Sequence, residues 1–423
     1  MNITRKNKTL KLLPMIAVLF WVGCEELDFP DPNNPTDDTA PIQSLITGAE
    51  SVMRQDMGVY LRDLLVIGRE AYYLEPADPR YTGELLHGPI DPGGFLCYRP
   101  WQTTYKVIAN CETIMGSDEA DAGATGVAQT LTAYSLMRLV YLWDINGARL
   151  NYDGDITASV STKAEVLAEI ESLLDGGYSD LGTAGSAFSF SLSGGFEGFD
   201  TPATFALFNR GLRARVAVHQ DDWDAAQDAL DACADWASGD ADDGVYHVFS
   251  TGSNDQGNEM YEAADGDYVK LMIHPSHVAD AEAGDTRVTD NTYIRSEVIT
   301  YDGLESSIAP TLYSSSYDPV PIMRAVELQL LQAEVHIGKE DYSSAETIMN
   351  AIRTAAGVAD YSGTDADNAV NRVLHEKRYS LFLEGHRLVD MRHYGKTGDL
   401  PLDRPERGDS IVTFPIPETE TPG

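Results

Sequence analysis

Helical spacing dominates the pattern of apolar and polar positions along the chain. In several segments apolar residues recur at intervals of three and four, which places them on one face of an α-helix. Thr162 and Glu165 have the spacing of a capping box, and Gly176 with Gly177 is typical of a helix end. We therefore predict helices over residues 42–58, 101–115 and 127–143, and a fourth from Thr162 to Gly176-Gly177.

Two stretches, 178–202 and 244–319, lack this periodicity. They are rich in Gly, Ser, Asn and Tyr, which is typical of loops and short strands. Irregular segments of this length in a folded protein commonly carry function. We expect a ligand to bind where these stretches reach the surface.

A repeat relates two predicted helix pairs, over residues 202–236 and 322–356. Trp223 and Tyr342 take the same place in the two pairs. Further matching positions are Ala226 with Ala345, Leu212 with Leu331, and Leu230 with Met349. An aromatic residue followed three positions later by alanine resembles the tetratricopeptide repeat, whose helix hairpins must stack on neighbours to bury their apolar faces. We predict a mainly α fold of tetratricopeptide-like helix pairs stacked into one domain, with irregular loop and short-strand insertions forming the ligand face.

The N-terminus has the layout of a secretory signal. Four basic residues precede an apolar run over residues 12–22, which is shorter than the roughly 20 residues that a membrane-spanning helix needs. Trp21-Val22-Gly23-Cys24 resembles a bacterial lipobox. We predict a signal peptide over residues 1–23, lipidation of Cys24 and an acidic, Pro-rich tether over residues 24–41. The alternative is an ordinary signal peptide with a coincidental cysteine.

The charge balance restricts the partners. The chain has 30 Lys and Arg against 67 Asp and Glu, a net charge of −37. Nucleic-acid binding needs Lys and Arg for phosphate contacts, so nucleic acid is excluded as a partner. Cys97, Cys111 and Cys233 show no metal-binding spacing. We predict Cys111 and Cys233 as core residues, and a Cys97–Cys111 disulfide remains an alternative.

No catalytic signature is present in the sequence. His274 and His277 lack the further ligands of a zinc site, and the acidic turns at 153–155 and 240–244 lack calcium-loop spacing. We predict no metal centre and no cofactor, with loosely bound calcium possible. Glu384 has helical spacing to Arg378 and Arg387, which predicts ion pairs that hold the last helix in place.

Tyrosines outside the predicted helices are the candidate binding residues. Sugar rings pack on aromatic faces and hydrogen-bond to a few polar side chains. Two loop clusters fit this chemistry: Tyr72, Tyr73, Asp78, Arg80 and Tyr81, and Tyr293, Arg295, Tyr301, Tyr313 and Tyr317. The alternative is that many of these rings pack beneath the loops.

Several segments of the chain resemble the SusD/RagB family. Residues 101–110 match its first core helix, and residues 321–334, followed by Asn350 and Arg353, match a later one. The most specific match spans residues 375–392, and residues 414–418 match the family's ending. The chain departs from the pattern at Lys377, where the family often has Arg, and at Ser380, where it often has Glu.

This resemblance implies a function and a location. SusD/RagB proteins are outer-membrane lipoproteins that capture nutrients, usually glycans, without catalysis, and deliver them to a SusC-like TonB-dependent transporter. We therefore expect a SusD-like helical-repeat domain over residues 42–423, with its motif region at about 320–423, held at the cell surface of the outer membrane by the lipid. The rival interpretations are a lipid-anchored glycan hydrolase and a non-catalytic helical-repeat adaptor.

Overall fold

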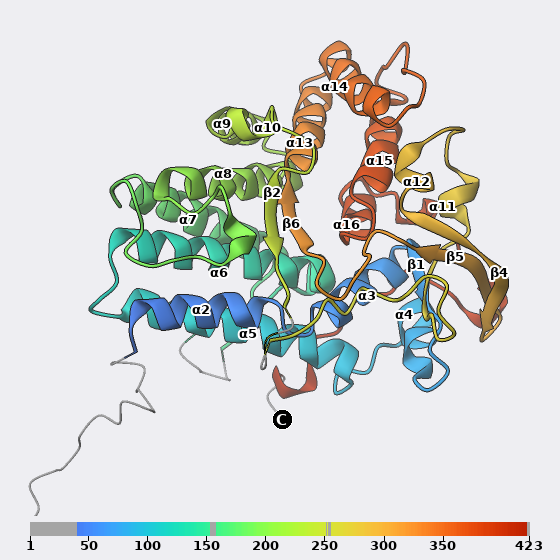
Figure 1. Cartoon of the computed structure of the whole chain (residues 1–423), viewed down its shortest axis with the longest axis horizontal. Helices are drawn as coiled ribbons and strands as arrows, with labels where there is room; N and C mark the ends of the chain where they lie inside the picture. Colours follow the sequence, from blue (N-terminus) through green and yellow to red (C-terminus); the bar gives the residue numbers. More distant parts are fainter. Residues whose placement is uncertain (1–39, 153–157, 251, 253–254, 421–423) are drawn as a thin grey trace, which may run out of the picture. The chain divides into compact units, whose positions relative to one another are not determined.

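A computed structural model describes residues 40–152, 158–250, 252 and 255–420 (Figure 1). All described helices and strands lie in one compact unit, Ile42–Gly423. The fold is mainly α-helical with three small two-stranded sheets, which confirms the predicted fold class. Cys24 and the predicted signal peptide lie outside the described residues.

The N-terminal part is a layer of long helices: α2 (Ile42–Met53), α3 (Met57–Ile67), α5 (Phe95–Gly116), α6 (Ala122–Trp143) and α7 (Lys163–Leu181). The predicted helix over 42–58 is wrong in extent, because a turn with Asp56 at φ 53° separates α2 from α3. Every residue of α3 is buried. Because α3 is buried on all sides, Arg62 and Asp63 included, it has no solvent-facing polar side, and the sequence pattern did not reveal it.

The capping box of α7 is confirmed. The Glu165 backbone N–H donates to Thr162 Oγ1 at 3.3 Å, and the Thr162 backbone N–H donates to Glu165 Oε2 at 2.8 Å. The predicted end at Gly176-Gly177 is wrong, since α7 continues to Leu181. A Cβ atom on Gly177 would lie 3.0 Å from the Gly126 carbonyl oxygen of α6. Gly177 therefore permits close helix packing instead of ending the helix.

The two repeated helix pairs are confirmed. They are α8 (Pro202–His219) with α9 (Trp223–Ala232), and α13 (Ala325–Gly338) with α14 (Tyr342–Ala355). Trp223 and Tyr342 are the first residues of α9 and α14. A Cβ atom on Gly338 would lie 2.3 Å from the Trp223 ring. The end of one repeat therefore lies directly against the aromatic residue that opens the second helix of the other.

The sheets are all antiparallel: β1 (Ala71–Tyr73) with β3 (Leu271–Ile273), β2 (Gly244–His247) with β6 (Val320–Arg324), and β4 (Thr292–Tyr301) with β5 (Leu304–Pro310). Short helices accompany them: α4 (Glu84–His87), α10 (Ala234–Ala237), α11 (Ser276–Ala279) and α12 (Thr286–Thr289). Single 3-10 turns lie at Pro79–Tyr81, Asp144–Asn146, Gly194–Phe196, Thr397–Asp399, Pro405–Arg407 and Glu418–Glu420. Four of these six strands fall in the stretch 244–319, for which the sequence predicted loops and short strands.

The C-terminal helices are α15 (Ala369–Ser380) and α16 (His386–His393). The predicted local ion pairs of Glu384 are wrong, because the chain leaves the helical path between α15 and α16, where Leu383 and Gly385 have φ 63° and 83°. Glu384 pairs instead with Arg324 of β6, and Arg378 pairs with Asp280 at 2.8 Å. These charges do hold the C-terminal region in place, but through partners distant in the sequence.

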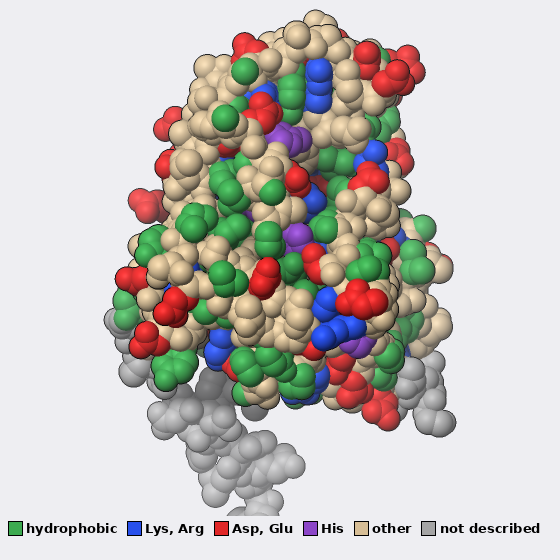
Figure 2. Space-filling view, turned by 90° about the vertical axis from the view of Figure 1, so that its right-hand side faces the viewer, with side chains coloured by type: hydrophobic (Ala, Val, Ile, Leu, Met, Phe, Trp, Pro, Cys, Tyr) green, Lys and Arg blue, Asp and Glu red, His purple; other side chains and the backbone are tan. Residues whose placement is uncertain are grey.

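The acidic excess is visible at the surface. Figure 2 shows Asp and Glu side chains spread along the edges of one face, with smaller groups of Lys and Arg between them. Among the described helices, none is long and apolar enough to cross a membrane.

Cys97, Cys111 and Cys233 are buried free thiols. The predicted core placement of Cys111 and Cys233 is therefore confirmed, and the alternative of a Cys97–Cys111 disulfide is wrong.

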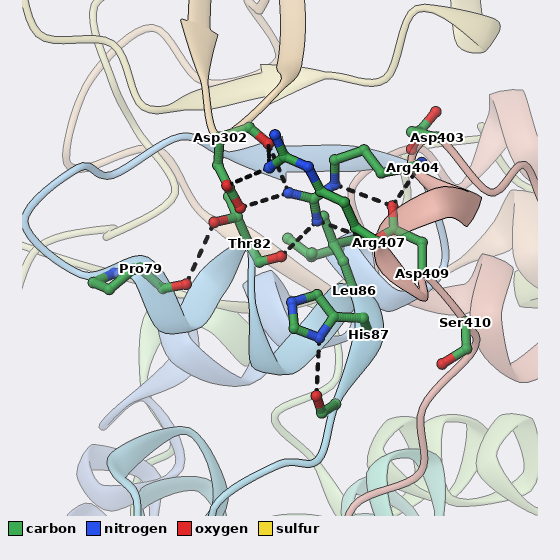
Figure 3. A network of polar contacts seen from close by, with 12 residues as sticks. Pro79, Thr82, Leu86, His87, Asp302, Asp403, Arg404, Arg407, Asp409 and Ser410 are labelled. Atoms are coloured by element: carbon green, nitrogen blue, oxygen red, sulfur yellow. Dashed lines mark hydrogen bonds and ion pairs between the residues drawn. The ribbon is translucent and has the colours of Figure 1, made fainter.

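A buried arginine joins the tip of the β4–β5 hairpin to two other parts of the chain (Figure 3). Arg404 donates to the Asp302 carbonyl oxygen at 2.9 Å, to the Thr82 carbonyl oxygen at 2.7 Å and to Asp409 Oδ1 at 3.0 Å. Arg407 donates to Asp302 Oδ1 at 2.7 Å. The hairpin is therefore held between the segment after β1 and the C-terminal segment.

Candidate functional site

A cavity of about 720 Å³ lies where the second repeat meets the insertions. Its lining comes from α13, α14 and the end of α15, from β2, β6 and α12, and from the loops beside them. Its polar and aromatic lining consists of Asp240, Asp242, Tyr246, Thr286, Arg287, Asp290, Asn291, Tyr313, Asp318, Arg324, Gln329, Tyr379, Ser380, Phe382 and Glu384. A cavity of this size accommodates a small organic ligand.

Tyr313 lines this cavity and carries a buried, unpaired hydroxyl. Its side chain is only 7% exposed, and its hydroxyl has no hydrogen-bond partner among the described residues. Burial raises the pKa of Tyr313, so the hydroxyl stays protonated. The other two cavity tyrosines are satisfied within the protein: Tyr246 donates to the Asp242 carbonyl oxygen, and Tyr379 donates to the His277 carbonyl oxygen at 3.1 Å. Since a buried unpaired hydroxyl is costly, Tyr313 is suited to bind a polar group inside the cavity.

Arg324 is one of two cationic side chains in the wall. It pairs with Asp242 at 2.6 Å and with Glu384, and donates to the Ser380 carbonyl oxygen at 2.6 Å. Burial opposes the charge on Arg324, but Glu384 and Asp242 outweigh it and raise its pKa.

Arg287 is the other cationic side chain, and carboxylates surround it as well. Its guanidinium donates to both oxygens of Asp285, at 2.9 and 2.7 Å, and to Glu376 Oε2 at 2.7 Å. A further N–H donates to Ser380 Oγ at 3.0 Å. The charges of Arg287 and Arg324 are therefore both neutralised by the protein itself.

The first predicted tyrosine cluster is brought together, but its rings are covered. Tyr72 and Tyr81 are 3% and 5% exposed. The Tyr73 and Tyr81 ring centroids are 4.5 Å apart, and the Arg62 guanidinium lies 4.7 Å from the centre of the Tyr73 ring. A surface sugar site requires an exposed aromatic face. The rings of Tyr72 and Tyr81 are buried and do not offer one.

The polar members of this cluster also have partners within the protein. Arg80 donates to both oxygens of Asp78 at 2.8 Å and lies 4.3 Å from the centre of the Phe95 ring. The hydrogen bonds from Arg80 lower the pKa of Asp78. Neither residue lines the cavity, and their role in ligand binding stays a prediction.

The second predicted cluster is spread out in the structure. Tyr313 lines the cavity, whereas Tyr293 and Tyr317 are exposed elsewhere, 43% and 50% respectively. Tyr301 is half-buried against the core, and Arg295 donates to the carbonyl oxygens of Ala264 and Gly266. Tyr313 is therefore the predicted residue that the structure places in the cavity, and the ligand roles of the others stay predictions.

Sequence reasoning missed most of the cavity wall. Arg287, Tyr379 and Asp242 come from three separate segments and meet only in the fold. Arg324 and Glu384 did stand in charged motifs, but their spacing along the chain suggested only a structural role. Nothing in the sequence marked Tyr379, because its spacing is that of an ordinary helix residue.

Ser276, His274 and Asp403 form a hydrogen-bonded chain that the sequence did not reveal. Ser276 Oγ lies 2.8 Å from His274 Nδ1, and His274 Nε2 lies 3.0 Å from Asp403 Oδ1. These are the residue types of a nucleophilic triad. However, His274 is buried, Arg378 also donates to Ser276 Oγ at 2.8 Å, and none of these residues lines the cavity described above.

Metal binding finds no support among the described residues, which contain no group of three His, Cys, Asp or Glu side chains placed to hold an ion. His277 stacks on the Phe382 ring at 4.2 Å, and burial lowers its pKa to about 3, so it is neutral. Asp153 and Asp155 lie outside the described residues, and the possible binding of calcium stays a prediction.

Comparisons with known proteins agree with the sequence resemblance. The SusD family model matches residues 252–410. A SusD superfamily protein from Bacteroides vulgatus has a TM-score of 0.65 at 15% identity, and a surface glycan-binding protein A from Bacteroides thetaiotaomicron has 0.67 at 12% identity. A laminarin-binding SusD-like protein has 0.64 at 14% identity. Each of these alignments covers 90% of this chain and 96% of the other.

A comparison with curated proteins finds no match. The likeness to the solved structures shows the fold, and the family model adds a match to the sequence over the region that forms most of the cavity. The resemblance to the SusD/RagB family is therefore confirmed over residues 252–410, and the chain has the fold of the SusD superfamily structures.

Proposed function

We propose that this protein captures an oligosaccharide at the cell surface and delivers it, without cleaving it, to a SusC-like TonB-dependent transporter. The observation that carries the proposal is the cavity of about 720 Å³ with the unpaired Tyr313 hydroxyl in its wall. The similar structures described as surface glycan-binding and laminarin-binding proteins support the ligand class.

The chemistry of the cavity suits a sugar. A sugar ring offers apolar C–H faces and many hydroxyls, each of which both donates and accepts hydrogen bonds. The cavity offers the partly exposed ring of Tyr246 together with carboxylate acceptors. The Tyr313 hydroxyl supplies a donor for a sugar oxygen, which would remove the cost of leaving it unpaired.

A glycan array and product analysis test this function. We expect a defined set of glycans to bind and to be recovered intact after incubation. Tyr313→Phe removes only the hydroxyl and should weaken binding severalfold, whereas Tyr317→Phe, outside the cavity, should leave it unchanged. An array without any bound glycan would contradict the proposal and favour the adaptor alternative.

The hydrolase alternative rests on the chain of Ser276, His274 and Asp403. It predicts shortened products when the bound glycan is incubated with the protein, and their loss in Ser276→Ala. Intact glycan in both samples supports the receptor function.

The anchor and the transporter are supported by the family resemblance and by the lipobox-like Gly23-Cys24 junction. Lipidation of Cys24 would hold the protein in the outer membrane with its binding domain at the surface. Cys24→Ala should abolish palmitate labelling and release the protein from the membrane fraction. Unchanged labelling of Cys24→Ala would contradict the anchor, and failure to co-purify with a SusC-like protein would contradict the transporter.

A further inference from the structure

We infer that the cavity rejects acidic glycans and accepts sugars that are uncharged or carry an amino group. This inference rests on the proposed function, because it names the chemical class of glycan that the same cavity would take. It follows from the charges in the wall and from the way the two arginines are used.

Carboxylates outnumber cations in the cavity wall. The acidic side chains are Asp240, Asp242, Asp290, Asp318 and Glu384, against Arg287 and Arg324. The wall therefore has five acidic and two basic side chains, a formal charge of 2 − 5 = −3. A uronate or a sulfate group entering this space would meet like charge.

Both arginines already form ion pairs with carboxylates of the protein itself. Recognition of a carboxylate or a sulfate requires guanidinium N–H groups that point at the ligand, typically as a bidentate pair. Arg287 uses its N–H groups on Asp285, Glu376 and Ser380. An anionic sugar could replace these contacts only by leaving the carboxylate of Asp285, whose side chain is 1% exposed, without its cation.

Arg324 is held by one buried carboxylate, Glu384, and by one exposed carboxylate, Asp242. It also donates to the Ser380 carbonyl oxygen. The Glu384 side chain is only 4% exposed, so water cannot replace Arg324 as the partner of its carboxylate. An acidic sugar would have to compete with this buried carboxylate for the guanidinium.

Two further carboxylates are available to a ligand. Asp240 and Asp290 are exposed and form no ion pair with a described residue. Their oxygens can accept hydrogen bonds from sugar hydroxyls or pair with the ammonium group of an amino sugar. These groups together fit a ligand without negative charge.

Isothermal titration with chemically matched probes tests the inference. The neutral hexose oligosaccharide with the strongest array signal is compared with two derivatives of it, one oxidised to the uronate at C6 and one aminated at C6. We expect the uronate form to bind at least tenfold more weakly than the neutral form, and the amino form to bind at least as well. Equal or tighter binding of the uronate form, or an acidic glycan as the strongest array signal, would overturn the inference while leaving glycan binding intact.

A pair of variants separates local charge from the charge of the whole protein. Asp240→Asn with Asp290→Asn should raise the affinity for the uronate form relative to the neutral form. Asp228→Asn with Asp235→Asn makes the same change in net charge at exposed sites outside the cavity and should not change this ratio. Equal ratios in both double variants would overturn the inference. Absence of binding by all three probes would instead refute the proposed function, and this inference with it.

Discussion

Arg215 of α8 and Glu327 of α13 form a buried bidentate ion pair that joins the first helices of the two repeats. Both N–O distances are 2.6 Å, and the two side chains are 3% and 1% exposed. Arg215 also donates to the Ile322 carbonyl oxygen at 2.9 Å in β6. The pair therefore couples the stacking of the repeats to the strand that ends at Arg324, in the cavity wall.

Removing one partner of this pair should strongly destabilise the fold. Arg215→Met leaves the Glu327 carboxylate buried without its cation, and we expect a loss of about 3–5 kcal/mol in the free energy of unfolding. Lys339→Met is the control, because its partner Asp224 is exposed, and should cost less than about 1 kcal/mol. Denaturant titration measures both. Similar small losses in the two variants would show that the buried pair does not hold the repeats together.

The buried carboxyl of Glu70 predicts a pH dependence of stability. Burial raises its pKa from 4.5 to about 7, even though the Leu383 backbone N–H donates to Glu70 Oε1 at 2.8 Å. Between these values the folded protein binds a proton that the unfolded chain has released, so this contribution to stability decreases as the pH rises from 4.5 to 7.

Glu70→Gln removes that titration and keeps an acceptor for Leu383. From pH 5 to pH 8, the wild type should lose on the order of 1–3 kcal/mol in unfolding free energy relative to Glu70→Gln. Chemical denaturation at the two pH values measures the difference. Parallel pH profiles of the two proteins would refute the burial argument.

Exposed and buried tyrosines should respond differently to truncation. Tyr72 is buried and contacts the His274 ring at a centroid distance of 5.0 Å, so Tyr72→Ala should cost about 3–5 kcal/mol, as expected for a large aromatic residue in a core. Tyr317→Ala should leave the melting temperature nearly unchanged, because its ring is half exposed. Calorimetry of both variants checks this. Equal melting temperatures would mean that the Tyr72 ring is not part of the core.

The acidic surface predicts stabilisation by salt. With 67 acidic and 30 basic residues, mutual repulsion opposes the folded state, and salt shortens its range from about 10 Å at 0.1 M to about 3 Å at 1 M. The melting temperature should therefore rise between 0.1 M and 2 M KCl. Sucrose at matched osmolality is the control for effects other than screening, and a flat or falling melting temperature in KCl would contradict the prediction.

The sequence predicted the repeats well, because their signals are local. Trp223 and Tyr342 recur at equivalent positions, and each opens its helix as expected. The burial of α3 and the close packing at Gly177 depend on neighbouring helices, so neither could be recognised from periodicity or from helix-ending residues alone.

The site was less predictable for the same physical reason. Loop tyrosines were a reasonable guide to sugar binding, yet a loop position does not determine whether a ring faces solvent or core. Tyr72 fills the core, whereas Tyr313 reaches the cavity. Arg324 meets Glu384 across 60 positions of sequence, a contact set by the stacking of the second repeat against the C-terminal segment.

The central claim is that an oligosaccharide binds in the cavity between the second repeat and the insertions. Its most direct test is isothermal titration of the array-selected oligosaccharide into two variants. Ala355→Trp places a large side chain in the cavity from α14, and Thr347→Trp places the same side chain at an exposed position of α14 outside the cavity. Both variants should melt near the wild type. We expect Ala355→Trp to bind at least about tenfold more weakly, a loss of about 1.4 kcal/mol, and Thr347→Trp to bind like the wild type. Wild-type affinity in Ala355→Trp would contradict the claim.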